Sequence, residues 1–241
     1  MTAFGALVVV ILRGLLGRRR TLLMALLAAL PILVGLLIRL GGGRSDAPEI
    51  LDTLVVRTVL PLIALVFGTA TIGSEIEDGT IVYLLAKPIA RWRVALAKLA
   101  VAAGLTAALV VPPIVVTGLL VGGLSGGSLA TAFGFALAVM AGGTAYAVAF
   151  SALGALTSRA LVVGLGYTLL WEGVLAGLLD GTRFMSIRQG TLGVAAALTG
   201  VDVGVDVLAP IVAIPILVVV VVGGFLLTTR ALSRFQVRSS D

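Results

Sequence analysis

Residues 99–158 read LAVAAGLTAALVVPPIVVTGLLVGGLSGGSLATAFGFALAVMAGGTAYAVAFSALGALTS, without a single charged side chain. As a helix, this stretch is on the order of twice as long as one crossing of a lipid bilayer requires. The Gly- and Ser-rich run at 122–128 is its natural turn, because clustered glycine and serine interrupt helices. The stretch therefore predicts two membrane-spanning helices, at about 95–121 and 129–157.

The rest of the chain has the same apolar character. Hydrophobic residues make up 60% and charged residues 12% of the 241 positions, and the mean hydropathy is +1.22. Soluble domains are roughly half apolar and a quarter charged. No polar stretch is long enough for a separate globular domain, so residues 1–241 are expected to form one transmembrane domain.

Four more segments reach the length of about 20 mainly apolar residues that a spanning helix needs. They are residues 21–40, 53–74, 161–179 and 207–229. Open strand edges cannot face lipid, so the expected fold is an all-α integral membrane protein with six transmembrane helices.

The N-terminal residues 2–17 are apolar but too short to span, and Arg13 interrupts them. Their apolar side chains share one helical face, and basic residues follow. This pattern predicts an amphipathic helix along the inner leaflet, with its arginines toward anionic headgroups. An unstructured tail is the alternative.

Lysine and arginine are divided unequally between the two sides of the predicted bundle. Twelve lie on one side: Arg13, Arg18, Arg19, Arg20, Lys87, Arg91, Arg93, Lys98, Arg159, Arg230, Arg234 and Arg238. Five lie on the other: Arg39, Arg44, Arg57, Arg183 and Arg188. The positive-inside rule makes the first side cytoplasmic, together with both termini. Topology therefore accounts for the net charge of +6, which does not indicate nucleic-acid binding.

The loop at 75–93 is the longest on the cytoplasmic side. It opens with three acids, Glu75, Glu77 and Asp78, ahead of a helical run. Acids at this place favour the positive end of a helix dipole. Gly79 and Thr80 then suit a turn and a helix cap.

A short apolar stripe follows in the same loop, formed by Ile81, Leu84 and Leu85. Pro88 ends the helix, and Arg91 begins the return to the membrane interface. The loop thus predicts a short amphipathic helix between spans two and three. An apolar stripe outside the bilayer needs a surface to pack on, which is either the membrane itself or another protein.

Residues 75–91 follow the pattern Glu-x-x-x-Gly-Thr-Ile-x-x-Leu-Leu-x-x-Pro-Ile-x-Arg. This pattern resembles the first cytoplasmic loop of the permeases of type-2 exporters among the ATP-binding-cassette transporters. The nitrous-oxide-reductase maturation permeases and bacterial drug-efflux permeases are similar in this segment. Trp171-Glu172, followed by Ser186-Ile187-Arg188-Gln189, is similar to the end of such permeases.

The resemblance implies that the loop is a coupling helix seated in a groove of a separate nucleotide-binding ATPase. Two permease chains would pair, as a homodimer or a heterodimer, above two ATPase subunits in a prokaryotic plasma membrane. The expected ATPase contact consists of Glu75, Glu77, Asp78, Gly79, Thr80, Ile81, Leu84, Leu85, Pro88 and Arg91.

The chain is not expected to be an enzyme. A P-loop requires Gly-Lys-[Ser/Thr], and the only lysines, Lys87 and Lys98, both follow alanine. Cysteine and histidine are absent, which excludes disulfides, thiolate nucleophiles, His/Cys zinc sites and imidazole bases. No cofactor or metal is predicted, and ATP hydrolysis is assigned to the partner.

Glu172 is the one ionisable residue near the middle of a predicted span. Burying such a group costs roughly 2.5–3.5 kcal/mol, so it marks a functional or a buried position. One interpretation places it on the translocation path or at a gate, in contact with a cationic substrate. The others are a hydrogen bond to a neighbouring span, an ion pair with Arg57, or a shifted span that leaves it near the outer interface.

The outer loop at 180–206 is too long for a tight turn, and glycines punctuate its apolar faces. This pattern predicts short helices in the outer interface. The resemblance implies a lid or a re-entrant element over the exit.

The favoured function is therefore export of a substrate, such as a hydrophobic drug or a lipid-like molecule. The alternative is an ion-coupled secondary transporter or channel that uses Glu172. An intramembrane enzyme is disfavoured, because histidine ligands are absent and only one acid lies at depth.

Overall fold

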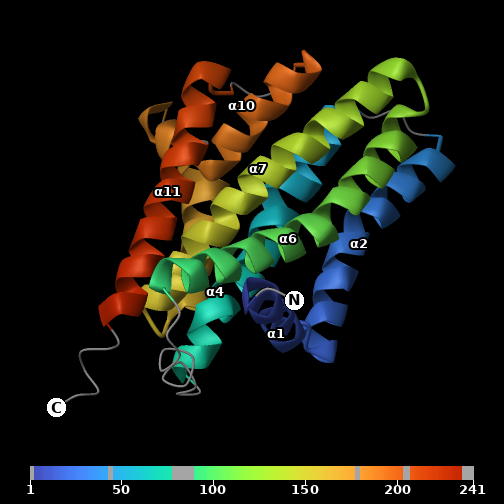
Figure 1. Ribbon diagram of the computed structural model, residues 1–241. Helices are drawn as coiled ribbons and strands as arrows, with labels where there is room; N and C mark the ends of the chain where they lie inside the picture. Colours follow the sequence, from blue (N-terminus) through green and yellow to red (C-terminus); the bar gives the residue numbers. More distant parts are fainter. Residues whose placement is uncertain (1–2, 43–45, 78–89, 177–179, 203–206, 235–241) are drawn as a thin grey trace.

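The computed structural model describes residues 3–42, 46–77, 90–176, 180–202 and 207–234 (Figure 1). Within these ranges all regular structure is helical. The predicted coupling helix falls almost wholly at 78–89, outside the described residues. Its flanking helices end at Glu77 and begin at Arg91.

In the described part of the chain, five helical segments are long and apolar enough to cross a membrane. The first is α2 (Arg18–Leu40), and the second joins α3 (Ala47–Ile50), the π-helical η1 (Leu51–Val59) and α4 (Leu60–Glu77). The others are α6 (Arg91–Gly122), α7 (Gly126–Leu156) and α11 (Pro210–Arg234). The protein is thus a multi-pass membrane protein, as its composition predicts.

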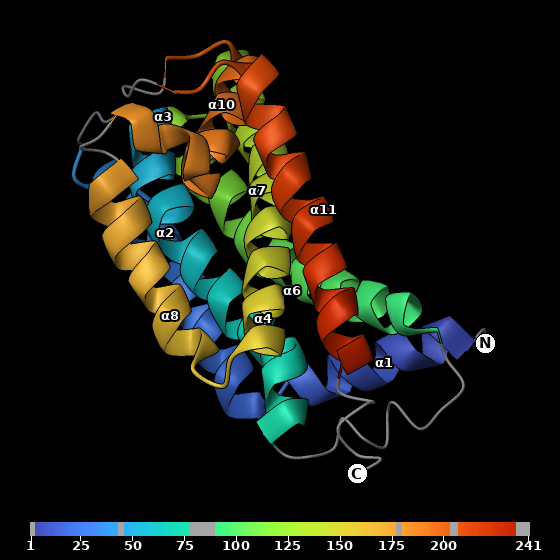
Figure 2. The ribbon, with the colours of Figure 1, turned by 90° about the vertical axis from the view of Figure 1, so that its left-hand side faces the viewer.

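A shorter apolar segment lies between α7 and the C-terminal part. It consists of α8 (Ala160–Gly166) and the π-helical η2 (Tyr167–Leu175). Figure 2 shows it running alongside α4. It coincides with most of the predicted span at 161–179, whose last residues lie outside the described part of the chain.

The N-terminal helix α1 (Ala3–Leu15) crosses one end of the bundle, beside the last turns of α4 (Figure 2). It contacts α4 and α6 and buries Ile11 and Leu15. A helix at this position is therefore confirmed. Its location on the inner leaflet stays a prediction.

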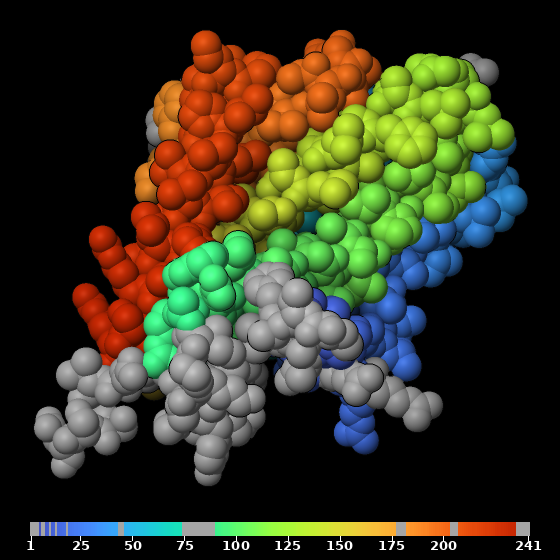
Figure 3. Space-filling model, in the orientation of Figure 1, coloured from blue at the N-terminus to red at the C-terminus, as the bar shows by residue number. Residues whose placement is uncertain are grey.

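The central helix of the bundle is α7, which contacts α4, α6, α10 and α11. About two thirds of the residues in the apolar stretch of α7 are buried, against 17% for α2 and 22% for α11. Small residues along α7 permit this close packing. In Figure 3, α11, α7 and α6 lie side by side on one broad face. Each of these helices has exposed apolar side chains, for example Val116, Phe133 and Val218. Such a surface suits lipid.

The predicted turn between the two uncharged helices is confirmed. Helix α6 ends at Gly122, and Gly123 takes a φ of 81°, which favours glycine. The Ser125 hydroxyl then caps α7 by accepting a hydrogen bond from the Ser128 amide at 3.2 Å.

The helix α10 (Ile187–Thr199) differs from expectation. It follows η3 (Asp180–Met185) and was predicted to lie in the outer interface. Instead most of its residues are buried, and it packs between α7, α11 and η1. A Cβ at Gly142 would lie 1.9 Å from the Thr191 hydroxyl, and one at Gly134 would lie 2.4 Å from the Thr199 methyl.

These two contacts show that α10 runs antiparallel to α7. Its C-terminal end therefore lies near the start of α7, and its N-terminal end lies deep in the bundle. Glycines on α7 let the two backbones approach closely, which places α10 inside the bundle and not on its surface. The implied lid or re-entrant element stays a prediction.

Replacing Gly142 with alanine is expected to displace α10 and to destabilise the protein by about 1–3 kcal/mol, since overpacking a tight contact forces backbone shifts. The matched control is Gly104→Ala in α6, where an added Cβ meets nothing within 4 Å. Thermal unfolding of the purified proteins compares the two variants. Equal melting temperatures would show that α10 is not held against α7 in this register.

Candidate functional site

Glu172 lies on η2 with its side chain directed into the bundle and only 2% exposed. Five hydrogen-bond donors surround its carboxylate. Oε1 accepts from the Tyr146 hydroxyl at 3.0 Å and from the Tyr167 hydroxyl at 2.8 Å. The Ser186 hydroxyl donates to Oε2.

The remaining two donors are backbone amides of the first turn of α10. The Ile187 amide donates to Oε1 at 2.8 Å and the Arg188 amide at 3.4 Å. Ser186 is the N-cap of α10, and its hydroxyl accepts from the Gln189 amide at 3.0 Å. The carboxylate thus lies at the positive end of a helix dipole, where a negative charge is favoured.

Aromatic packing holds the two tyrosines in place. The Tyr146 and Phe150 rings stack with centroids 5.8 Å apart, and Phe150 meets Tyr167 edge-on at 6.3 Å. Tyr146 belongs to α7 and Tyr167 opens η2. Glu172 therefore joins α7, η2 and α10 through one side chain.

A second charged contact lies next to the first. The Arg188 Nε donates to the Asp52 Oδ1 at 3.0 Å, and its Nη2 donates to the other carboxylate oxygen. Both side chains are buried, with Asp52 4% and Arg188 7% exposed. Asp52 belongs to η1, so this two-pronged ion pair joins α10 to the second spanning segment.

We call the hydrogen-bonded cluster of Glu172 with Tyr146, Tyr167, Ser186 and the Ile187 and Arg188 amides the clamp. Four of the five donors engage the Glu172 Oε1, and the Ser186 hydroxyl engages Oε2. With the side chain only 2% exposed, a cationic substrate would have to displace protein groups to reach this carboxylate. The hydrogen bonds from Ser186, Ile187 and Arg188 to Glu172 hold the N-terminal end of α10 inside the bundle.

The interpretations of Glu172 can now be compared with its surroundings. The hydrogen bond to a neighbouring span is present, through Tyr146. The ion pair with Arg57 is not formed among the described contacts, because the Arg57 Nη2 donates to the Gly173 carbonyl at 2.8 Å. Its exposure of 2% shows that other residues of the chain cover the Glu172 side chain. Its depth in the membrane stays a prediction. Its part in a gate stays a prediction.

The two segments that resemble the end of exporter permeases meet in this clamp, since Glu172 bonds Ser186, Ile187 and Arg188. The expected ATPase contact at 75–91 is not brought to it. Of that contact, Glu75 and Glu77 belong to the last turn of α4, and Arg91 begins α6. The residues between them, Asp78 to Pro88, lie outside the described part of the chain.

Sequence analysis did not assign Tyr146, Tyr167 or Asp52 to this site. The sequence did offer one signal: Tyr146 and Tyr167 lie inside apolar spans, where a hydroxyl group needs a hydrogen-bond partner. Asp52 precedes the predicted start of the span at 53–74 and was therefore not expected to be buried. The helix in fact begins at Ala47, and Arg188 neutralises Asp52 within it.

Comparison with known families identifies the fold. The family described as ABC-2 family transporter protein matches residues 16–171, which is more than half of the chain. The chain belongs to this family. Such ABC-2 permeases are typically non-catalytic membrane components and generally work with a nucleotide-binding subunit.

The match to the ABC-2 family includes the loop at 75–91 and ends one residue before Glu172. Comparison with curated protein sequences finds no match. The role of the clamp therefore rests on the geometry of this chain.

Proposed function

We propose that this ABC-2 permease is the membrane subunit of an ATP-driven exporter in a prokaryotic plasma membrane. Two permease chains would pair above two copies of a nucleotide-binding ATPase. The observation that carries the proposal is the coupling-loop pattern of residues 75–91, which lies inside the family match at 16–171. A loop of this composition gives the ATPase an apolar stripe to grip.

The proposed topology has six spans with both termini in the cytoplasm. The segment of α8 and η2 supplies the fifth span, running beside α4 (Figure 2). Twelve of the 17 basic residues then fall on the side where α4 ends and α6 begins. The positive-inside rule supports a cytoplasmic location for this end.

The ATPase would bind at this end. The loop connects α4, which ends at Glu77, to α6, which begins at Arg91, and both helices contact α1. Movement of the loop would be passed to α4 and α6, which contact each other and α7. These contacts support a mechanical connection between the loop and the centre of the bundle.

The test removes the apolar stripe. The double substitution Leu84→Asp and Leu85→Asp is expected to weaken binding of the ATPase subunit at least about tenfold, since two apolar anchors are lost. ATP hydrolysis would then no longer drive export. Co-purification and transport in proteoliposomes measure these effects. The control is Leu124→Asp, an exposed leucine in the turn between α6 and α7.

Unchanged affinity of the double variant for the ATPase would refute the coupling assignment. Loss of affinity in the Leu124 variant as well would indicate misfolding of the chain. Circular dichroism and gel filtration of both variants separate this case, because an intact bundle keeps its helix content and its size.

The ion-coupled alternative has less support. It needs a carboxylate that an ion can reach, and Glu172 is 2% exposed with five donors around it. It would also leave the loop at 75–91 without a partner. Transport by the purified permease alone in a proton gradient would favour this alternative.

A further inference from the structure

One face of the second spanning segment carries a stripe of positions spaced three or four residues apart. The stripe is formed by Thr58, Leu62, Val66, Ala70 and Gly73, which lie above one another on a helix. The fifth segment, α8 with η2, runs along this face (Figure 2). Two cavities open on the seam between these segments.

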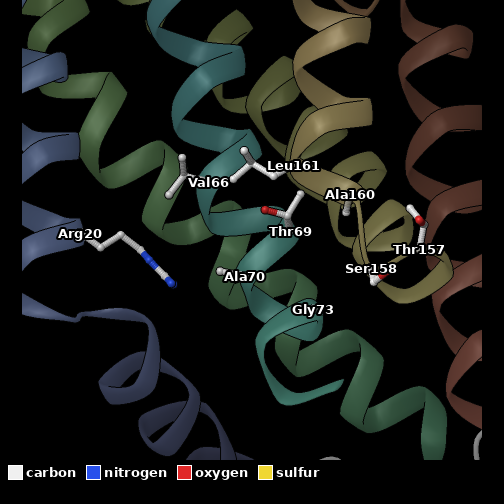
Figure 4. Close-up of a pocket in the computed structure, with 9 residues that line it drawn as sticks. All are labelled: Arg20, Val66, Thr69, Ala70, Gly73, Thr157, Ser158, Ala160 and Leu161. Atoms are coloured by element: carbon white, nitrogen blue, oxygen red, sulfur yellow. The ribbon is translucent and has the colours of Figure 1, made fainter. Parts of the chain in front are cut away.

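The first cavity lies near the end of the bundle that the proposed topology makes cytoplasmic. It has a volume of about 180 Å³, and Val66, Thr69, Ser158 and Leu161 are among its lining residues. Figure 4 shows the Arg20 side chain reaching into this space from α2. Among the described residues, no hydrogen bond or ion pair engages the Arg20 guanidinium, so its donors face the cavity.

The second cavity lies at the other end of the same seam. It has a volume of about 230 Å³ and is lined by Arg57, Thr58, Leu62, Thr168, Leu169 and Gly173. The Arg57 Nη2 donates to the Gly173 carbonyl at 2.8 Å. A guanidinium has five N–H donors in all, so Arg57 keeps donors for a further group.

The two segments pack tightly at Gly164. A Cβ at Gly164 would lie 2.2 Å from the Leu65 Cδ1 and 3.3 Å from the Phe150 ring. Gly164 lies between Leu161 of the first cavity and Thr168 of the second. The stripe from Thr58 to Gly73 rises about 22 Å, which is most of the ~30 Å hydrocarbon thickness. The two arginines therefore mark the two ends of one seam.

The chemistry of both cavities is the same. Each offers one guanidinium beside apolar walls, and no acid is among the described residues that line them. The hydroxyls of Thr58, Thr69 and Thr168 already donate to backbone carbonyls, which leaves the guanidinium as the main donor in each cavity. A guanidinium matches the geometry of a phosphate group. The nearby acid, Glu172, lines neither cavity.

We propose that the substrate is a phosphate-bearing amphiphile, a lipid-like molecule whose headgroup binds Arg20 in one cavity and Arg57 in the other. This inference rests on the proposed exporter function and narrows its substrate class. Ser158 lines the first headgroup site together with Arg20, and the apolar walls face the tail. Movement between the cavities requires the Gly164–Leu65 contact to open.

The experiment uses the full chain in nanodiscs, without ATP and without an ATPase subunit. The probes are phosphatidylglycerol and diacylglycerol, which share the same tails but differ in the phosphate, and each carries a photoactivatable group on one acyl chain. Mass spectrometry of the cross-linked peptides maps the label. Phosphatidylglycerol is expected to label α4 and α8 preferentially, and Arg20→Gln to reduce labelling around the first cavity by about tenfold, the effect of one charged hydrogen bond.

Two further variants complete the design. Arg20→Lys keeps the charge and is expected to retain most of the labelling. Arg39→Gln is the control, because the Arg39 Nη1 donates to the Leu120 carbonyl and Arg39 lines neither cavity. Equal melting temperatures of the four proteins exclude misfolding as the cause.

Equal labelling by diacylglycerol, which lacks the phosphate, would overturn the proposal, as would full labelling of Arg20→Gln. Competition by soluble glycerol phosphate as effective as that by the lipid would indicate a small anion and would overturn the amphiphile. Because no ATPase is present, a negative result leaves the exporter function standing. A failure to bind an ATPase, in turn, leaves the lipid site standing.

Discussion

Replacing Glu172 with alanine is expected to destabilise the protein by at least about 3 kcal/mol. The substitution leaves five donors without their acceptor in a buried site. Each buried donor that loses its partner costs about 1–3 kcal/mol, and water that enters the space recovers part of the total. The N-terminal turn of α10 also loses the negative charge that its dipole favours.

Thermal unfolding of the purified protein measures this effect. Glu49→Ala is the control, since Glu49 is an exposed acid on α3 and its removal is expected to change little. Glu172→Gln is expected to lie between the two, because the amide oxygen accepts while its NH₂ group opposes a donor. Hydrogen exchange of the α10 amides locates the change.

A Glu172→Gln protein with normal stability but without export would contradict the clamp and return Glu172 to the translocation path. A protein with lower stability and residual export in proportion to the folded fraction would support the clamp. The two outcomes differ in whether function follows folding, which separates a gate from a structural contact.

The spans were predictable because a spanning helix must be long and apolar enough to cross the hydrocarbon layer of the bilayer. The uncharged stretch at 99–158 became α6 and α7, with the turn at its Gly- and Ser-rich centre. The predicted span boundaries were less accurate where a charged residue forms an ion pair with a residue distant in the sequence. The second segment begins at Ala47, six residues before the predicted start, because Asp52 is paired with Arg188.

The depth of α10 was not predictable from its own residues. Gly190 and Gly193 seemed to break an interfacial helix, but they allow contact with its neighbours. A Cβ at Gly190 would lie 3.0 Å from the Leu217 Cδ2, and one at Gly193 would lie 2.4 Å from the Leu208 carbonyl oxygen. A glycine in a sequence has the same appearance whether it ends a helix or lets a helix approach another.

The clamp around Glu172 shows the same limit. An isolated acid in a span indicated a buried or functional position, and Glu172 is indeed buried. The donors come from α7, η2 and the first turn of α10, and the sequence separations range from 5 to 26 residues. Only the fold determines which of these groups meet.

The ion pair between Asp52 and Arg188 is expected to show a large single-mutant effect and a smaller double-mutant effect. Asp52→Ala and Arg188→Ala should each destabilise the protein by about 3–5 kcal/mol, because each leaves the other charge buried without its partner. The double variant should lose less than the sum, since neither uncompensated charge remains. Asp46→Ala, at an exposed N-cap without a side-chain hydrogen bond, is the control.

A double-mutant cycle of thermal unfolding measures the coupling between the two side chains. A coupling near zero would mean that Arg188 is held by α10 alone and that η1 is not attached to it through this pair. A coupling of several kcal/mol would mean that the second spanning segment and α10 are joined as one unit. In that case a movement of α4 must either carry α10 with it or break this ion pair. The strength of the pair would then determine how readily the N-terminal end of α10 separates from η1.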